Sequence, residues 1–229
     1  DQDLTGYQII AAPMLYMFRS GIEQKLRTFV QNGGILIMTY WSGIVNETDL
    51  CHLGGTPHHL IDVLGIRSEE IDGLYDNQCN YMVPASNNFM TLPATYLCTH
   101  LCDLVQLKGA VPLMQYADNF YAGYPALTVH KYGDGLAFYL CADAEDTFYY
   151  DFYRQIIQEQ ELPVIMDHIP EGIEVSSRSS GRQEFIFAQN YTDSPIPFTL
   201  PGHAQILFGK YDGTIKEYST LIYQMEVKS

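Results

Sequence analysis

Residues 7–40 read YQIIAAPMLYMFRSGIEQKLRTFVQNGGILIMTY. Two short apolar runs, 7–12 and 35–40, flank a segment whose apolar residues recur with helical spacing. Ser20, followed three residues later by Glu23, is typical of a capped helix start, and the Asn-Gly-Gly that follows is typical of a helix end. A strand, a helix and a strand in this order predict parallel strands joined by a crossover, and therefore an α/β sheet covered by helices.

The rest of the chain changes character near residue 165. Residues 126–142 predict a hairpin around Gly-Asp-Gly, and 146–160 predict a helix, whereas 66–120 show short strands without a clean period. Beyond the change near residue 165, short segments of alternating apolar and polar residues are separated by Gly, Pro, Asp and Ser. We therefore expect an α/β domain over 1–165 and a small antiparallel β-sandwich over 166–229.

The composition restricts the classes of partner. Hydrophobic residues make up 47% of the chain, so it can bury a core. The net charge of −15, from 27 acids and 12 bases, argues against nucleic acid and anionic membranes, which select basic surfaces. The longest apolar runs are too short to span a bilayer, and no signal-peptide order is present at the start. These features predict a cytoplasmic protein. The chain begins without methionine, which suggests that it is part of a longer protein.

Ser42 stands where a parallel strand ends, which is a usual place for catalytic groups. A serine-hydrolase elbow requires G-x-S-x-G, but Ser42 follows Tyr and Trp, so the motif argues against a nucleophile. Two carboxylate pairs could be proposed for glycoside hydrolysis: Glu47 with Asp49, and Glu69 with Glu70. Neither pair is predicted to lie at the ends of two separate strands, so no catalytic residue is assigned.

Neither the histidines nor the cysteines predict a catalytic or metal-binding site. His58 and His59 lie at a predicted helix start, where adjacent histidines are usually exposed polar residues rather than catalytic bases. Cys98 and Cys102 are four residues apart, without a second pair to complete a zinc pattern. The sequence therefore predicts reduced thiols and neither a metal nor a cofactor.

Long segments nevertheless resemble a known family. The segments are DLTGYQIIAAPMLYM, FVQNGGILIMTYWSGIVNETDLCHLGG, LIDVLGIRSEEID, YAGYPALTVHKYGDGLAFYLCA and EFIFAQNYTDSPIPFTLP. They resemble the middle and C-terminal domains of glycoside hydrolase family 42 β-galactosidases, across essentially the whole chain.

The resemblance implies a flavodoxin-like or class I glutamine amidotransferase-like parallel sheet with helices on both faces, used for trimerisation, and then a small β domain. In the family, both catalytic glutamates lie on a preceding (β/α)8 barrel, for which this chain is too short. The resemblance therefore implies a non-catalytic part of a retaining β-galactosidase that hydrolyses terminal β-D-galactosides. Its implied partners are its own barrel and two further copies in a homotrimer, and the first β-α unit of the middle domain is expected to be missing.

Within this reading, Trp41, Asn46, Glu47 and Asp49 are expected to form an interface or to close the galactoside pocket. The simpler alternative is that Trp41 covers the core of its own domain. Two other functions stay open. One is an amidotransferase-like hydrolase that uses Ser42 or a cysteine, and the other is a free-standing carbohydrate-binding module, for which the 18 tyrosines are weak support.

Overall fold

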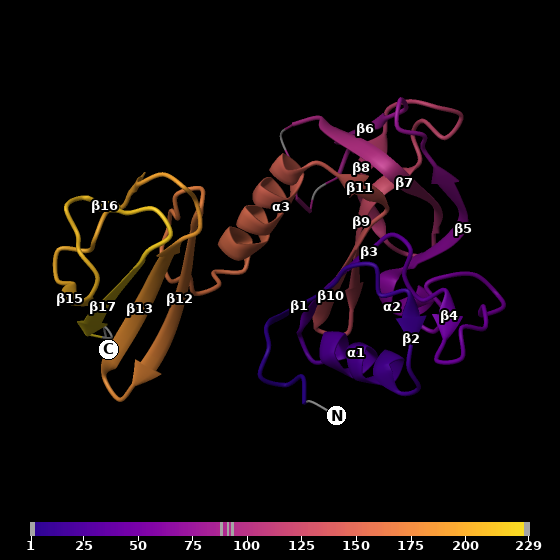
Figure 1. The fold of residues 1–229 in the computed structure, drawn as a ribbon. Helices are drawn as coiled ribbons and strands as arrows, with labels where there is room; N and C mark the ends of the chain where they lie inside the picture. Colours follow the sequence, from indigo (N-terminus) through magenta and orange to yellow (C-terminus); the bar gives the residue numbers. More distant parts are fainter. Residues whose placement is uncertain (1–2, 88, 91, 93, 227–229) are drawn as a thin grey trace. The chain divides into compact units, whose positions relative to one another are not determined.

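The computed structural model describes residues 3–87, 89–90, 92 and 94–226. The chain forms two compact units, Asp1–Ile156 and Ile157–Ser229, here called the amino-terminal and carboxyl-terminal units (Figure 1). In the described residues, no helix has the length and apolar character needed to cross a membrane.

The predicted strand–helix–strand unit is present. Strand β1 (Ile9–Ala12) pairs in parallel with β3 (Ile35–Thr39), and α1 (Ile22–Gln31) connects them. All five residues of β3 are buried, as expected for a strand with neighbours on both edges and helices over the sheet. Outside this sheet, a two-residue parallel pairing joins β2 (Met17–Phe18) to β4 (Val45–Asn46).

The capping box predicted at Ser20 is wrong. The N-cap residue is Gly21, in the left-handed conformation at φ 89°, and no side chain caps the helix. Glu23 does fold back, because its carboxylate accepts a hydrogen bond from the Gly21 amide at 3.3 Å. The chain thus enters α1 through a residue without a side chain, which leaves Ser20 outside the capping position.

The main sheet is mixed, so the prediction of a mostly parallel sheet is wrong. Its strand order is β1-β3-β10-β9-β8-β6-β7-β11, with β5 also paired to β7. Among the described strand pairs of this sheet, β1–β3 and β3–β10 are parallel and the others are antiparallel. Short connections such as the 133–134 turn explain this, because a parallel pairing requires a long crossover. The remaining strands are β5 (Ile66–Gly73), β6 (Asn80–Pro84), β7 (Tyr96–Leu107), β8 (Val111–Tyr116), β9 (Pro125–Tyr132), β10 (Gly135–Leu140) and β11 (Ala142–Ala144).

Helices cover both faces of the sheet around β10. Phe138 and Tyr139 are consecutive and point to opposite faces. On the first face, Phe138 contacts Phe152 of α3 (Asp146–Glu159), with ring centroids 5.4 Å apart. On the second face, Gly135 lies against the end of α1. Helix α2 (Ile61–Leu64) covers the same second face, where the carbonyl of Val63 lies 2.9 Å from Nδ1 of His130 in β9.

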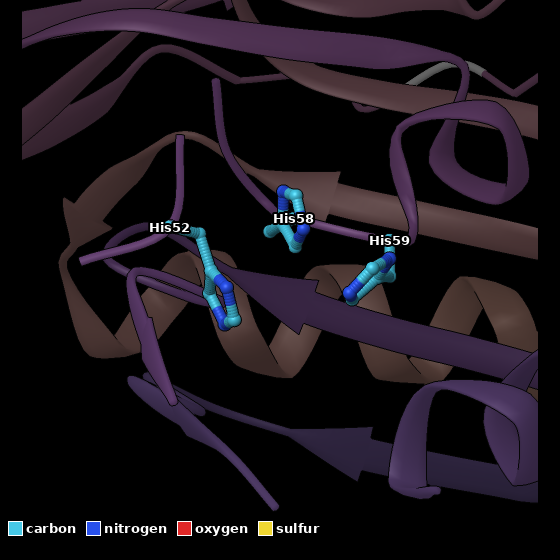
Figure 2. Close-up of side chains that lie close together, drawn as sticks. All are labelled: His52, His58 and His59. Carbon is cyan, nitrogen blue, oxygen red and sulfur yellow. The ribbon is translucent and has the colours of Figure 1, made fainter. Parts of the chain in front are cut away.

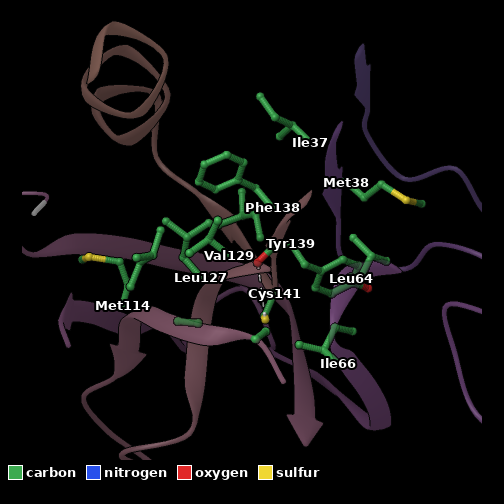
Figure 3. Close-up of a cluster of buried hydrophobic side chains, with 14 of the residues drawn as sticks. Ile37, Met38, Leu64, Ile66, Met114, Leu127, Val129, Phe138, Tyr139 and Cys141 are labelled. Atoms are coloured by element: carbon green, nitrogen blue, oxygen red, sulfur yellow. Dashed lines mark hydrogen bonds between the residues drawn. The ribbon is translucent and has the colours of Figure 1, made fainter. Parts of the chain in front are cut away.

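The core of this unit is centred on β3, β9 and β10. Figure 3 shows Ile37 and Met38 of β3 near Phe138 and Tyr139 of β10, with Leu127 and Val129 of β9 among the neighbouring side chains. The hairpin predicted over 126–142 is confirmed as β9 and β10, and the helix predicted over 146–160 is confirmed as α3.

The carboxyl-terminal unit is antiparallel, as predicted. Its larger sheet has the order β12-β13-β17-β15, and a two-stranded sheet pairs β14 with β16. The strands are β12 (Ile173–Ser180), β13 (Gln183–Asn190), β14 (Ile196–Pro197), β15 (Gln205–Phe208), β16 (Thr214–Ile215) and β17 (Thr220–Glu226). Its separate core includes Ile186, Phe198, Leu221 and Tyr223.

Candidate functional site

The loop that follows β3, residues 41–59, is here called the strand-end loop. Ser42 anchors its start, because its Oγ donates to the carbonyl of Thr39 at 2.7 Å and accepts from the amide of Leu15 at 3.1 Å. The residue is 1% exposed. A hydroxyl that is buried and bonded to two backbone groups ties adjacent segments together, and it is poorly placed to attack a substrate.

Trp41 lies at the surface of this loop. Its backbone is in the left-handed region at φ 55°, and its side chain is 38% exposed. The ring packs edge-on against Tyr16, with centroids 6.0 Å apart. Further large exposed apolar side chains belong to the strand-end loop, to β2 and to the segment before β2: Met14, Met17, Leu50 and Leu53. Exposed apolar side chains thus occur on both segments beside Trp41, which is the kind of surface that another domain or subunit could cover.

The other three predicted site residues follow Trp41 in one turn. Asn46 shapes the turn, since its Oδ1 accepts hydrogen bonds from the Thr48 amide and hydroxyl and from the Leu50 amide. Asp49 accepts a long hydrogen bond of 3.5 Å from the Tyr16 hydroxyl. Tyr16 therefore touches both Trp41 and Asp49, whereas Asn46 acts on the backbone and Glu47 is exposed.

A buried carboxyl group lies beneath Trp41. Asp103 of β7 is 1% exposed, and its Oδ2 accepts from the Tyr139 hydroxyl at 2.6 Å and from the Trp41 amide at 3.3 Å. Its Oδ1 is buried and has no hydrogen-bond partner among the described residues. Burial raises the pKa of Asp103 from 3.8 to about 6, against the opposing effect of these two donors. The sequence did not single out Asp103, because the segment that carries it shows no period.

The carboxylate pairs do not form a glycosidase site. Glu69 and Glu70 are consecutive exposed residues of one strand, and Arg67 lies 3.4 Å from Glu69. Glu47 and Asp49 share one exposed turn. A glycosidase instead needs two carboxyl groups that face each other across a sugar.

The histidines are arranged differently from the prediction. His58 and His59 precede α2 instead of starting it, and the fold brings His52 beside them. His59 is exposed as predicted, whereas His58 is half-buried. Burial, together with the neighbouring His59 and His52, lowers the pKa of His58. The sequence signal for this arrangement is Gly54-Gly55, which bends in the left-handed conformation between His52 and His58.

The structure gives little support to the two alternative functions, an amidotransferase-like hydrolase and a carbohydrate-binding module. All five cysteines are free, and Cys98, Cys102 and Cys141 are buried. Burial raises the pKa of Cys102 to about 11, and it raises those of Cys98 and Cys141 further, which disfavours the reactive thiolate. Several tyrosines that could have served a sugar-binding surface are fully buried core residues: Tyr96, Tyr116, Tyr121, Tyr139 and Tyr223.

Comparison with known families gives a match over both units. The model of the β-galactosidase trimerisation domain matches residues 1–163, and that of the β-galactosidase C-terminal domain matches 172–225. The chain belongs to glycoside hydrolase family 42. The predicted resemblance to the trimerisation and C-terminal domains of family 42 is therefore confirmed.

Individual relatives agree with this family. The β-galactosidase Pbg of Clostridium perfringens is 41% identical over 84% of this chain, and BglY of Alicyclobacillus acidocaldarius is 40% identical over the same share. The solved structure of a cold-adapted β-galactosidase from Rahnella sp. R3 is 41% identical, with a TM-score of 0.89, and covers 99% of this chain. The chain spans 28% of the length of each of these two curated relatives and 33% of the Rahnella protein.

Proposed function

We propose that this chain is the non-catalytic assembly part of a β-galactosidase. The observation that carries the proposal is the match of residues 1–163 to the β-galactosidase trimerisation domain. In this proposal the complete protein is a cytoplasmic, retaining enzyme that hydrolyses terminal β-D-galactosides, with its catalytic carboxylates on a barrel outside this chain. The two units hold three copies together and pack against the barrel, and the boundary between the domains lies at 165/166.

The parallel β1-α1-β3 unit supports kinship with flavodoxin-like and amidotransferase-like domains, which we propose as the origin of the trimerisation domain. In this view, Ser42 occupies the strand end without the nucleophilic role that such a position often has. Its two backbone hydrogen bonds suit a residue that fixes an interface loop.

We expect the isolated chain to show no turnover of a chromogenic β-galactoside, because neither of its two candidate pairs, Glu47 with Asp49 and Glu69 with Glu70, is arranged as an acid and a nucleophile across a sugar site. The measurement compares the purified chain with a variant that carries Glu47→Gln and Asp49→Asn. Turnover by the unmodified chain that the variant loses would place a glycosidase site in the strand-end loop and would contradict the proposal.

We further propose that Trp41, with Asn46, Glu47 and Asp49, packs against a barrel of the same or an adjacent subunit. A large aromatic side chain that is exposed in a free domain and covered in an assembly is a typical centre of an interface. In the full-length enzyme, Trp41→Ala is therefore expected to weaken the trimer at least about thirtyfold, or to raise KM by a similar factor, since tryptophan hot spots contribute about 2 kcal/mol or more.

The matched control is Tyr75→Ala, which removes an aromatic side chain that is 76% exposed elsewhere on the amino-terminal unit. Sedimentation across a dilution series measures assembly, and initial rates measure KM. If Trp41→Ala unfolds the isolated chain but leaves assembly and KM of the full-length enzyme intact, Trp41 serves the core of its own domain instead.

A further inference from the structure

Three histidines gather at the end of the strand-end loop (Figure 2). The rings of His52 and His58 are stacked with centroids 4.2 Å apart, and those of His58 and His59 lie 3.8 Å apart. One ring nitrogen from each residue lies within 4.8 Å of the other two. Four-coordinate zinc with Zn–N bonds of about 2.0–2.1 Å holds ligand nitrogens roughly 3.4 Å apart, so modest side-chain rotations would converge the three rings on one ion.

The backbone at each histidine is already held. The amide of His52 donates to the carbonyl of Ile44 at 2.9 Å, and the amide of His58 donates to the carbonyl of Gly43 at 3.1 Å. The carbonyl of His59 accepts from Nη2 of Arg27 at 2.7 Å. A ligand set on fixed backbone loses little conformational entropy when it binds an ion.

The close approach at Gly43 shows how tightly His58 is positioned. Gly43 has a φ of 62°, and a Cβ at this position would lie 3.0 Å from both the amide nitrogen of His58 and Cα of Pro57. The start of the strand-end loop therefore sets the place of the histidines at its end.

His52 also carries an unsatisfied polar atom. Its Nε2 is buried and has no hydrogen-bond partner among the described residues. Leaving a buried polar atom without a partner costs about 1–3 kcal/mol, and a bound water or ion is one of the explanations for such an atom in a native protein. An ion bound at Nε2 would provide that partner.

We propose that His52, His58 and His59 form a site for a divalent transition-metal ion of the zinc class, with the remaining coordination positions open to water. Three imidazole nitrogens suit zinc, copper or nickel, whereas magnesium and calcium prefer oxygen ligands. The ion would join His52 to His58 and His59, which lie on either side of the bend at Gly54-Gly55. It would thereby stabilise the loop that carries Trp41, by binding chemistry that is independent of the glycosidase reaction.

The test uses the 229-residue chain after removal of metal with a chelator. Titration calorimetry with Zn²⁺ should show one ion bound per chain. Mutation of a residue that only orients a metal ligand typically weakens metal binding about 10–100-fold. The three histidines are the ligands themselves, so His52→Ala, His58→Ala and His59→Ala should each weaken Zn²⁺ binding at least about 100-fold. The matched control, His203→Ala, removes an exposed histidine of the carboxyl-terminal unit and should leave affinity unchanged.

Cobalt(II) tests the ligand identity, because Cys51 and Cys79 are exposed and could bind metal by themselves. Imidazole-bound cobalt lacks the near-ultraviolet charge-transfer band that a thiolate ligand produces. Thermal unfolding in the presence of chelator first shows which variants fold. If His52 or His58 proves essential for folding, the variant of the exposed residue, His59→Ala, provides the test of metal binding. Zn²⁺ affinity that survives in folded His59→Ala, absence of binding by the unmodified chain, or a thiolate band would each overturn the proposal.

Discussion

Gly135→Ala is expected to destabilise the amino-terminal unit by about 3 kcal/mol, near the upper end of the usual cost of overpacking. A Cβ at this position would lie 2.2 Å from the carbonyl oxygen of Val30 and 2.4 Å from that of Gly34. Both contacts are backbone atoms at the end of α1 and in its link to β3. No side-chain rotation can relieve them, so the helix or β10 would have to move.

Chemical denaturation followed by tryptophan fluorescence measures this effect. Trp41 is the one tryptophan in the sequence, so the signal reports the amino-terminal unit. The matched control is Gly6→Ala, because a Cβ at Gly6 would meet no atom within 4 Å. Equal denaturation midpoints for the Gly135 and Gly6 variants would show that α1 is not packed this closely on β10.

Asp103 is expected to make the amino-terminal unit less stable as the pH rises from about 4 to about 7. The folded-state pKa of about 6 lies above the ordinary value of 3.8, so in this interval the folded state binds more protons than the unfolded state. The stabilising contribution of the neutral carboxyl is therefore complete below pH 3.8 and is lost as the pH rises through about 6. A difference of about two pKa units corresponds to on the order of 3 kcal/mol.

The Asp103→Asn variant keeps an oxygen that can accept the hydrogen bonds from Tyr139 and Trp41. Its side chain cannot ionise. The free energy of unfolding of Asp103→Asn, relative to that of the unmodified chain, should therefore rise between pH 4 and pH 7 by on the order of 3 kcal/mol. Asp134→Asn, which changes an exposed carboxyl in the β9–β10 turn, is the control for the other acids. Parallel stability curves for Asp103→Asn and the unmodified chain would contradict the shift.

Local signals in the sequence were sufficient to predict several elements. The helical spacing and the glycines after it predicted α1, and the Gly-Asp-Gly turn predicted the β9–β10 hairpin. These elements form between neighbours in sequence, so their patterns are visible within short windows. The order of the middle strands could not be read in this way. In β7, residues 102–105 are all buried, so this part of the strand lacks the alternation that marks one buried face.

The candidate site likewise contains residues that local sequence patterns predicted and residues that they did not. The strand-end position of Trp41 followed from the preceding apolar strand, whereas Asp103 reaches it from β7, 62 residues away. His52 joins His58 and His59 only through the folded path of the loop. Contacts between residues that are distant in the sequence depend on tertiary packing, and no periodic pattern in a single sequence predicts them.

The position of β3 has a consequence for synthesis on the ribosome. Its parallel neighbours are β1, which the ribosome makes before β3, and β10, which begins only at Gly135. While residues 40–134 are being made, one edge of this largely apolar strand has no partner from β10. A nascent chain that pauses in this interval would present an unpaired strand edge, the type of surface that chaperones bind and that otherwise leads to aggregation.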